Sequence, residues 1–224
     1  MNVRLISKST SPERLEFEGI NNAQDIVAYC ARVSNPSNQI NNETSERLIR
    51  YLVKHQHWSP LEMVNACLEI ETTRDIAHQI VRHRSFAFQE FSQRYANPEE
   101  QGDMFEYSEA RLQDTKNRQN SIETSDVGLQ SWWDAQQKFV AEISKKIYDE
   151  ALEKGIAKEQ ARKVLPEGLT KTKLYMNGSL RSWIHYIELR SANGTQKEHM
   201  EIAHACAKVI AGIFPLMSEL QQGE

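Results

Sequence analysis

The segment of residues 63–84 changes its hydrophobic periodicity once, and this change limits the folds open to the chain. Residues 63–72 alternate apolar and polar side chains, which is typical of a half-buried strand. From Ile76, apolar side chains then recur at i, i+1, i+4 and i+5, which predicts a helix with one buried face. A strand passing directly into a helix predicts a structure of mixed class.

The remaining periodicities predict further strands and helices without a regular strand–helix–strand repeat. We expect strands at residues 3–6 and 169–176, and helices at 22–33, 44–54, 126–154, 158–164 and 196–213, with another beginning at Leu180. Asn177-Gly178-Ser179 has turn composition, and we expect this segment to cap the helix that follows it. The chain therefore predicts an α+β fold, with a mixed or antiparallel sheet flanked by long helices.

Two segments have sequence patterns that predict roles beyond secondary structure. The helix at 126–154 carries an aromatic and aliphatic stripe at three- and four-residue spacing, which predicts either core or a subunit interface. Residues 98–120 are polar, and we expect a mobile surface segment, with a lid over a site as one role.

Composition excludes several classes of protein. The 224 residues suit one domain, 1–224, and the net charge of −4 argues against a nucleic-acid or anionic-membrane binder. No signal peptide or membrane-spanning stretch is visible, and three scattered cysteines favour a reducing compartment, so we expect a cytoplasmic protein. His55 and His57 lie in a turn without the spacing of a metal motif, and no metal is expected.

Residues 79–95 concentrate positive charge and aromatic rings. Arg82, Arg84 and Arg94 lie among three phenylalanines and a tyrosine, a combination that suits a ligand with both phosphate and a stackable ring. A solvated helix end with aromatic rings beneath it is the commoner explanation of such a segment. Binding of single-stranded nucleic acid, with Phe86, Phe88 and Tyr95 as stacking platforms, is a third interpretation.

The helix beginning at Leu180 separates two arginines. Arg190 follows Arg181 by nine residues, which at about 100° per residue is half a turn out of phase. If the helix runs through both, one subunit does not aim both side chains at one pocket. We hypothesise that active sites are built between subunits.

Four separated blocks resemble the flavin-dependent thymidylate synthase family. Arg82-His83-Arg84 with Glu90, Ser92, Arg94 and Tyr95 is similar to the family signature RHR-x-x-S-x-N-E-x-S-x-R-Y. The other blocks resemble H-x-[ST]-P-x-E at 57–62, A-R-x-V-L-P at 161–166 and R-x-x-x-[NH]-[FY]-[IL]-x-x-R at 181–190. Ala31-Arg32-Val33-Ser34 is a further, weaker similarity.

The resemblance implies reductive methylation of dUMP to dTMP. It implies 5,10-methylenetetrahydrofolate as carbon donor, FAD as hydride carrier, NADPH as reductant and a homotetramer. No glycine-rich dinucleotide fingerprint follows a strand, so FAD would be bound in a non-Rossmann manner. No cysteine follows a proline, as the nucleophile of unrelated thymidylate synthases does, so no cysteine nucleophile is expected.

The resemblance also implies roles for individual residues. It assigns dUMP binding to Gln79, Arg82, Glu90, Ser92, Gln93, Arg94, Arg162 and Arg190. It assigns FAD binding to Ser34, His57, Ser59, Glu62, Arg82, His83, Arg84, Glu90, Ser179, Arg181 and His185. Arg190 is the expected catalytic residue, because a guanidinium favours the N3-ionised uracil without acting as a base.

Three positions depart from the family pattern. Ala87 replaces the usual serine, Gln89 replaces a frequent asparagine, and Ser179 stands where asparagine is common, with Asn177 nearby. Because the departures at Ala87 and Gln89 each remove or move a hydrogen-bonding group, a flavoprotein that does not turn over is an alternative to the enzyme. The third departure leaves open whether Ser179 or Asn177 contacts the flavin.

Overall fold

An antiparallel sheet forms the centre of the chain in this computed structural model, which describes residues 2–220. Its strands lie in the order β1 (Asn2–Lys8), β2 (Asn65–Thr73), β6 (Lys171–Ser179) and β3 (Ala87–Glu90). β6 pairs with β2 along its whole length, from Asn65 opposite Ser179 to Thr73 opposite Lys171. The expected α+β class with an antiparallel sheet is confirmed.

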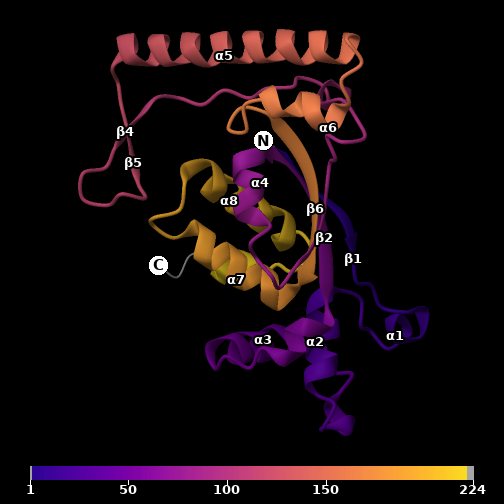
Figure 1. Ribbon diagram of the computed structural model, residues 1–224. Helices are drawn as coiled ribbons and strands as arrows, with labels where there is room; N and C mark the ends of the chain where they lie inside the picture. The colour runs from indigo at the N-terminus through magenta and orange to yellow at the C-terminus, as the bar shows by residue number, and fades with distance from the viewer. Residues whose placement is uncertain (1, 221–224) are drawn as a thin grey trace.

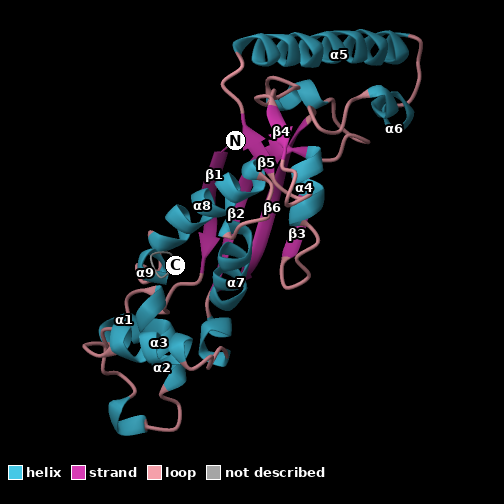
Figure 2. Ribbon diagram, turned by 90° about the vertical axis from the view of Figure 1, so that its left-hand side faces the viewer, coloured by secondary structure: helices cyan, strands magenta, loops and turns pink. Residues whose placement is uncertain are grey.

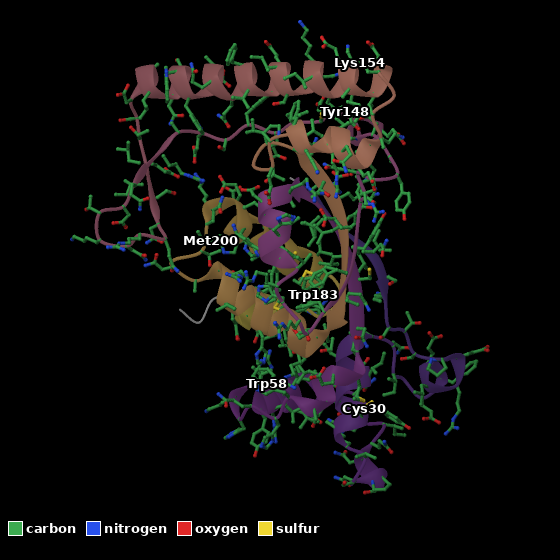
Figure 3. All side chains as sticks on the ribbon, viewed as in Figure 1. Cys30, Trp58, Tyr148, Lys154, Trp183 and Met200 are labelled. Carbon is green, nitrogen blue, oxygen red and sulfur yellow. The ribbon has the colours of Figure 1, made fainter. Side chains whose placement is uncertain are left out.

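Three helices cover one face of this sheet: α4 (Arg74–Ile80), α7 (Leu180–Ser191) and α8 (Lys197–Ala211) (Figure 1). The alternation in β2 turns Ala66, Leu68 and Ile70 toward the helices, where each is at most 1% exposed. Trp183 of α7 lies fully buried against them and donates from Nε1 to the carbonyl of Ala66 at 3.1 Å (Figure 3). The apolar face predicted from the sequence is therefore the core face.

The remaining elements lie toward the two ends of the sheet (Figure 2). One end carries α1 (Glu13–Phe17), α2 (Ala23–Ala31), η1 (Pro36–Asn38), α3 (Ser45–Lys54) and η2 (Ser59–Met63), with α9 (Met217–Leu220) following α8. The other end carries η3 (Pro98–Gln101), β4 (Arg111–Gln113), β5 (Ser121–Glu123), α5 (Val127–Glu153), α6 (Lys158–Ala161) and η4 (Arg162–Val164). No helix among residues 2–220 is both long and apolar enough to span a membrane.

Local signals set several helix ends. Asn22 caps α2 by accepting from the amide of Asp25, and Asp126 caps α5 by accepting from the amide of Leu129. Gly155 follows α5 with φ of 77°, a conformation that glycine adopts without strain. These ends agree with the predicted boundaries to within a few residues.

The turn predicted at Asn177-Gly178-Ser179 is wrong. These residues are the last of β6, because Asn177 and Gly178 pair with Cys67 and Ala66 of β2. The cap prediction is confirmed, since the Ser179 side chain accepts from the amide of Ser182 at 3.3 Å. Pairing with a neighbouring strand overrides the local turn preference.

The apolar stripe of α5 is not core. Trp132, Phe139, Val140, Ile143 and Ile147 are 42–58% exposed, whereas the side of α5 that faces the chain buries Gln137, Ala141 and Tyr148. α5 lies across the upper edge of the molecule, outside the helices that cover the sheet (Figure 1). Of the two roles predicted for the stripe, only that of a subunit interface stands.

The polar segment 98–120 is partly ordered. η3 begins it, and the hairpin β4–β5 closes at its end. Ion pairs Arg111–Glu198 at 2.5 Å and Lys197–Glu109 at 2.6 Å attach this region to the start of α8. Its predicted mobility and lid role stay predictions.

Gly178 lets the loop before β3 approach the sheet. A Cβ at this position would lie 2.4 Å from Cδ1 of Phe86, a buried ring that packs on Trp183 at 4.8 Å. We expect Gly178→Ala to destabilise the protein by about 1–3 kcal/mol through overpacking. Thermal unfolding measures this, with Gly168→Ala as control because a Cβ there meets nothing within 4 Å. Equal melting temperatures for the two variants would contradict the prediction.

Candidate active site

Arg190 and His83 meet at the end of α4. The Nε–H of Arg190 donates to Nε2 of His83 at 2.9 Å, and the His83 ring packs edge-on against Tyr186 at 4.9 Å. Burial, and then the positive charge of Arg190, lower the pKa of His83 to about 4. The imidazole is therefore neutral at physiological pH. Within residues 2–220 the terminal nitrogens of Arg190 have no hydrogen-bond partner, which leaves them for a ligand.

Arg82 and Arg84 flank His83 and point to solvent. Both side chains are exposed, and neither forms an ion pair with any residue in the range 2–220. These two guanidinium groups add positive charge at this end of α4, which suits anionic ligands.

A second cluster forms where α7 begins. The carboxylate of Glu62 accepts from Oγ of Ser179 at 2.6 Å and from Arg181 at 2.8 Å. The Ser179 hydrogen bond is the main cause that lowers the pKa of Glu62, with Arg181 adding to it. The carboxylate is therefore charged, and it holds Arg181 in the first turn of the helix.

The motif at residues 57–62 lies at the same cluster, next to the start of α7. The ring of Trp58 packs edge-on against His185, which lies one turn after Arg181, with ring centroids 4.5 Å apart. Ser59 starts η2, which carries Glu62, while His57 lies exposed just before it. The structure thus joins two blocks that are more than a hundred residues apart.

A third cluster lies beside α6. The guanidinium of Arg94 is 3.6 Å from Glu159 of α6, and Arg162 begins η4 directly after that helix. Ser92 accepts from the amide of Arg94 at 3.4 Å. Gln93 is only 3% exposed, yet its Nε2 has no hydrogen-bond partner in residues 2–220.

Two predicted site residues lie outside these clusters. Glu90 accepts from Arg74 at 3.1 Å and from Thr172 at 2.9 Å, so its carboxylate is held on the sheet. Ser34 is exposed after α2, and neighbouring Arg32 is buried, donating to the Asn41 carbonyl and to Thr44. Arg32 therefore braces the loop that follows Ser34.

The clusters lie apart within one chain. α7 runs unbroken from Leu180 to Ser191, which places Arg190 about 13 Å along the axis from Arg181 at 1.5 Å per residue. Their partners differ, since Arg181 contacts Glu62 and Arg190 contacts His83. Arg94 contacts α6, which lies at the other end of the sheet from the start of α7 (Figure 1).

Sequence reasoning missed polar residues that support the first cluster. His199 of α8 is fully buried and contacts Gln79 and Tyr186, and Gln196 also bonds to Gln79. Arg74, the partner of Glu90, was likewise not selected. The only signal in the sequence was a histidine on the apolar stripe of a helix, where charged or polar side chains are uncommon.

The structure also bears on the alternative interpretations. Phe86 is 9% exposed and packs on Trp183, so its predicted role as a free stacking platform is wrong, whereas Tyr95 is 79% exposed. Among residues 2–220 no three side chains of histidine, cysteine, aspartate or glutamate are grouped to hold a metal ion.

The hydrogen-bond donors at the N-terminus of α7 fit a flavin dinucleotide. Ser179 caps α7, and the first turn carries Arg181, so a helix N-terminus and a guanidinium lie together, a combination that favours a phosphate-bearing ligand. His185 and Trp58 add flat rings beside them. The fold and site therefore define an α+β protein of non-Rossmann type with cationic clusters suited to phosphate-bearing, ring-containing ligands.

Comparison with known proteins shows the family within that class. The model of the thymidylate synthase complementing protein family matches residues 17–216. A probable flavin-dependent thymidylate synthase of Paramecium bursaria Chlorella virus 1 is 49% identical over 219 residues, covering 98% of both chains. A flavin-dependent thymidylate synthase of Synechocystis sp. is 49% identical over 218 residues, covering 97% of this chain and 98% of its own. The chain belongs to the family of flavin-dependent thymidylate synthases, as predicted, and is an enzyme of that family.

A solved structure confirms the fold. A UMP/dUMP methylase from Streptomyces cacaoi, bound with 5-Br dUMP, superposes with a TM-score of 0.76 at 24% identity. The match covers 98% of this chain and 93% of the methylase. The predicted mixed fold is thus shared with a protein that acts on a uridine nucleotide.

Proposed function

We propose that this chain catalyses the reductive methylation of dUMP. The balanced reaction is dUMP, 5,10-methylenetetrahydrofolate, NADPH and a proton giving dTMP, tetrahydrofolate and NADP⁺. The observation that carries the proposal is the contact between Arg190 and His83, at 2.9 Å. It joins the residue expected to polarise the uracil ring to one expected at the flavin.

Four arginines bind and orient the nucleotide. Arg94 and Arg162 neutralise its phosphate, with the Ser92 hydroxyl nearby, while Arg82 and Gln79 hold it from the other side. Arg190 directs its terminal N–H groups at the ring, where they stabilise the N3-ionised form and raise the electron density at C5. These groups are already positioned by protein contacts, so the charge needs no reorganisation when it develops.

FAD is the flavin we propose, held by Glu62, Ser179, Arg181 and His185 with His83 and Arg84. When bound, it supplies hydride transfer from NADPH, which no side chain of the protein provides. Glu62 keeps Arg181 in place, and Trp58 orients His185. The neutral imidazole of His83 accepts from Arg190 and so sets the direction of that guanidinium.

A homotetramer with sites between subunits explains two features of the single chain. The first is that Arg94 contacts Glu159 of α6, whereas Arg190 contacts His83 after α4, so the two arginines lie in separate clusters. The second is the exposed apolar stripe of α5, whose spacing of three and four residues suits packing against another helix. We further propose the cytoplasm as its location, because Cys30, Cys67 and Cys206 are all free thiols.

Mixed oligomers test whether sites form between subunits. At a dUMP concentration below the wild-type dissociation constant, we expect Arg94→Ala and Arg190→Ala proteins each to show about a tenth of wild-type activity or less. Their coexpressed mixture should recover about a quarter of wild-type activity, as random pairing across a symmetric interface predicts. Two affinity tags isolate the mixed species before dTMP formation is assayed. If one subunit supplies both residues, every site in the mixture lacks one of them, and no recovery is seen.

The visible absorption spectrum tests the function itself. We expect the purified, FAD-incubated protein to show flavin bands that shift when dUMP is added, because the two ligands lie against each other. dTMP formation from the three substrates then follows by chromatography. Flavin bands that do not change when dUMP is added would favour a flavoprotein without this activity. A protein that binds no FAD would refute the proposal.

A further inference from the structure

His199 is a polar side chain in the core. It lies in the first turn of α8, is fully buried, and shares the apolar stripe of that helix with Ile202 and Cys206. A buried imidazole is unfavourable unless both ring nitrogens have partners. Its two partners here come from two other helices, Gln79 of α4 and Tyr186 of α7.

These contacts form one chain of hydrogen bonds. Oη of Tyr186 lies 3.2 Å from Nε2 of His199, and Nδ1 of His199 lies 3.2 Å from Oε1 of Gln79. Nε2 of Gln79 then donates to Oε1 of Gln196 at 2.7 Å. The chain begins in the core and ends in a polar hollow lined by Gln196 and Lys197.

The direction of each hydrogen bond follows from chemistry. Since Oε1 of Gln79 only accepts, Nδ1 of His199 must carry the ring proton, and Nε2 must accept from the Tyr186 hydroxyl. Burial raises the pKa of Tyr186 well above its ordinary value, so the hydroxyl keeps its proton. Burial, and then the charge of Arg190, lower the pKa of His199 to about 3, so the ring is neutral.

Both polar atoms of the Gln79 amide are therefore hydrogen-bonded, Oε1 to His199 and Nε2 to Gln196. Each keeps one further hydrogen bond for a ligand, a lone pair on Oε1 and an N–H on Nε2. The amide stands beside the Arg190–His83 pair, because the His83 ring packs on Tyr186 at 4.9 Å and lies 6.3 Å from His199. A side chain with several rotatable bonds would lose this orientation if Oε1 were released.

We propose that His199 is a positioning residue for the nucleotide, holding the Gln79 amide in the orientation that offers its remaining donor and acceptor to dUMP. Tyr186 anchors His199, and Gln196 holds the other end of the amide. The inference rests on the proposed function, in which Gln79 contacts dUMP. It adds a residue that touches neither nucleotide nor flavin.

Calorimetric titration of dUMP into the flavin-loaded protein tests the proposal. We expect His199→Leu to weaken dUMP binding about tenfold, as the loss of an oriented hydrogen-bonding group does, while flavin content is unchanged. His199→Asn places an amide nitrogen near the position of Nδ1 and is expected to restore most of the affinity. His204→Leu is the matched control, an exposed histidine on the same helix, and should bind dUMP as wild type does.

A double-mutant cycle shows whether His199 acts through Gln79. In a Gln79→Ala background, His199→Leu should cause no further loss of dUMP affinity, because the amide it orients is absent. A second loss of equal size would overturn the proposal, as would wild-type affinity in His199→Leu alone. If His199→Leu does not fold, His199→Asn is compared with His199→Gln, whose amide reaches toward Tyr186 instead. Equal or stronger binding by His199→Gln would overturn the proposal.

The outcomes separate this inference from the function on which it rests. A wild-type protein that binds flavin but not dUMP refutes the proposed function and the inference with it. A wild-type protein that binds dUMP, with His199 variants that bind equally well, refutes the inference alone.

Discussion

Replacing Arg190 with alanine is expected to reduce kcat for dTMP formation by about 10²–10³-fold, the usual cost of removing one preorganised donor from a developing charge. Arg190 is half-buried and held by its Nε–H on His83 at 2.9 Å, so its terminal nitrogens are directed before the nucleotide arrives. Initial rates at saturating dUMP, methylenetetrahydrofolate and NADPH measure the effect.

Two variants control for charge and for folding. Arg190→Lys keeps the positive charge but loses the planar fork and the bond to His83, and we expect most of the activity to be lost. Arg14→Ala removes an arginine whose side chain is 83% exposed in α1, and it should turn over as wild type does. An Arg190→Ala protein within a few fold of the wild-type rate would contradict the role assigned to this residue.

Replacing Arg94 with alanine is expected to weaken dUMP binding by about 10- to 100-fold, the range for losing a hydrogen-bonded charge pair with phosphate. Its side chain is 58% exposed, and its contact with Glu159 is long at 3.6 Å. Such a surface pair contributes little stability, so the variant should fold normally. Titration of dUMP into flavin-loaded protein gives the affinity.

Flavin binding shows whether Arg94→Ala affects dUMP binding alone or the folding of the whole protein. The Arg94 cluster lies away from Glu62 and Arg181, so the flavin absorbance of Arg94→Ala should match wild type. Arg47→Ala, on the exposed side of α3, is the matched control for removing one positive charge. Unchanged dUMP affinity in Arg94→Ala would refute its assignment to the phosphate.

Most of the fold was predictable because its signals are local. The alternation at 63–72 and the helical period after Arg74 report one buried face each, and both elements occur as expected, at Asn65–Thr73 and Arg74–Ile80. Capping residues such as Asn22 and Asp126 act within one turn, so the helix starts were also accessible. The prediction was wrong at Asn177-Gly178-Ser179, where pairing with distant Ala66 and Cys67 decides the structure.

The sequence predicted which residues belong to the candidate site, but it did not predict which of them contact one another. The motifs identified Glu62, Ser179 and Arg181, and only the tertiary structure makes them one hydrogen-bonded group. His199 carried almost no signal, because a single histidine in an amphipathic helix has many explanations. Its role became visible only when α4 and α7 placed Gln79 and Tyr186 against its two nitrogens.

The sequence by itself determined the class, the family and the chemical groups available, because periodicity, caps and motif spacing are properties of neighbouring residues. The tertiary structure decided which groups meet, since a hydrogen bond requires two atoms within about 3 Å whatever their separation along the chain. It also decided that the apolar stripe of α5 is exposed in the single chain. The residue pattern of a helix shows that it has an apolar face, but not whether another helix of the same chain covers that face.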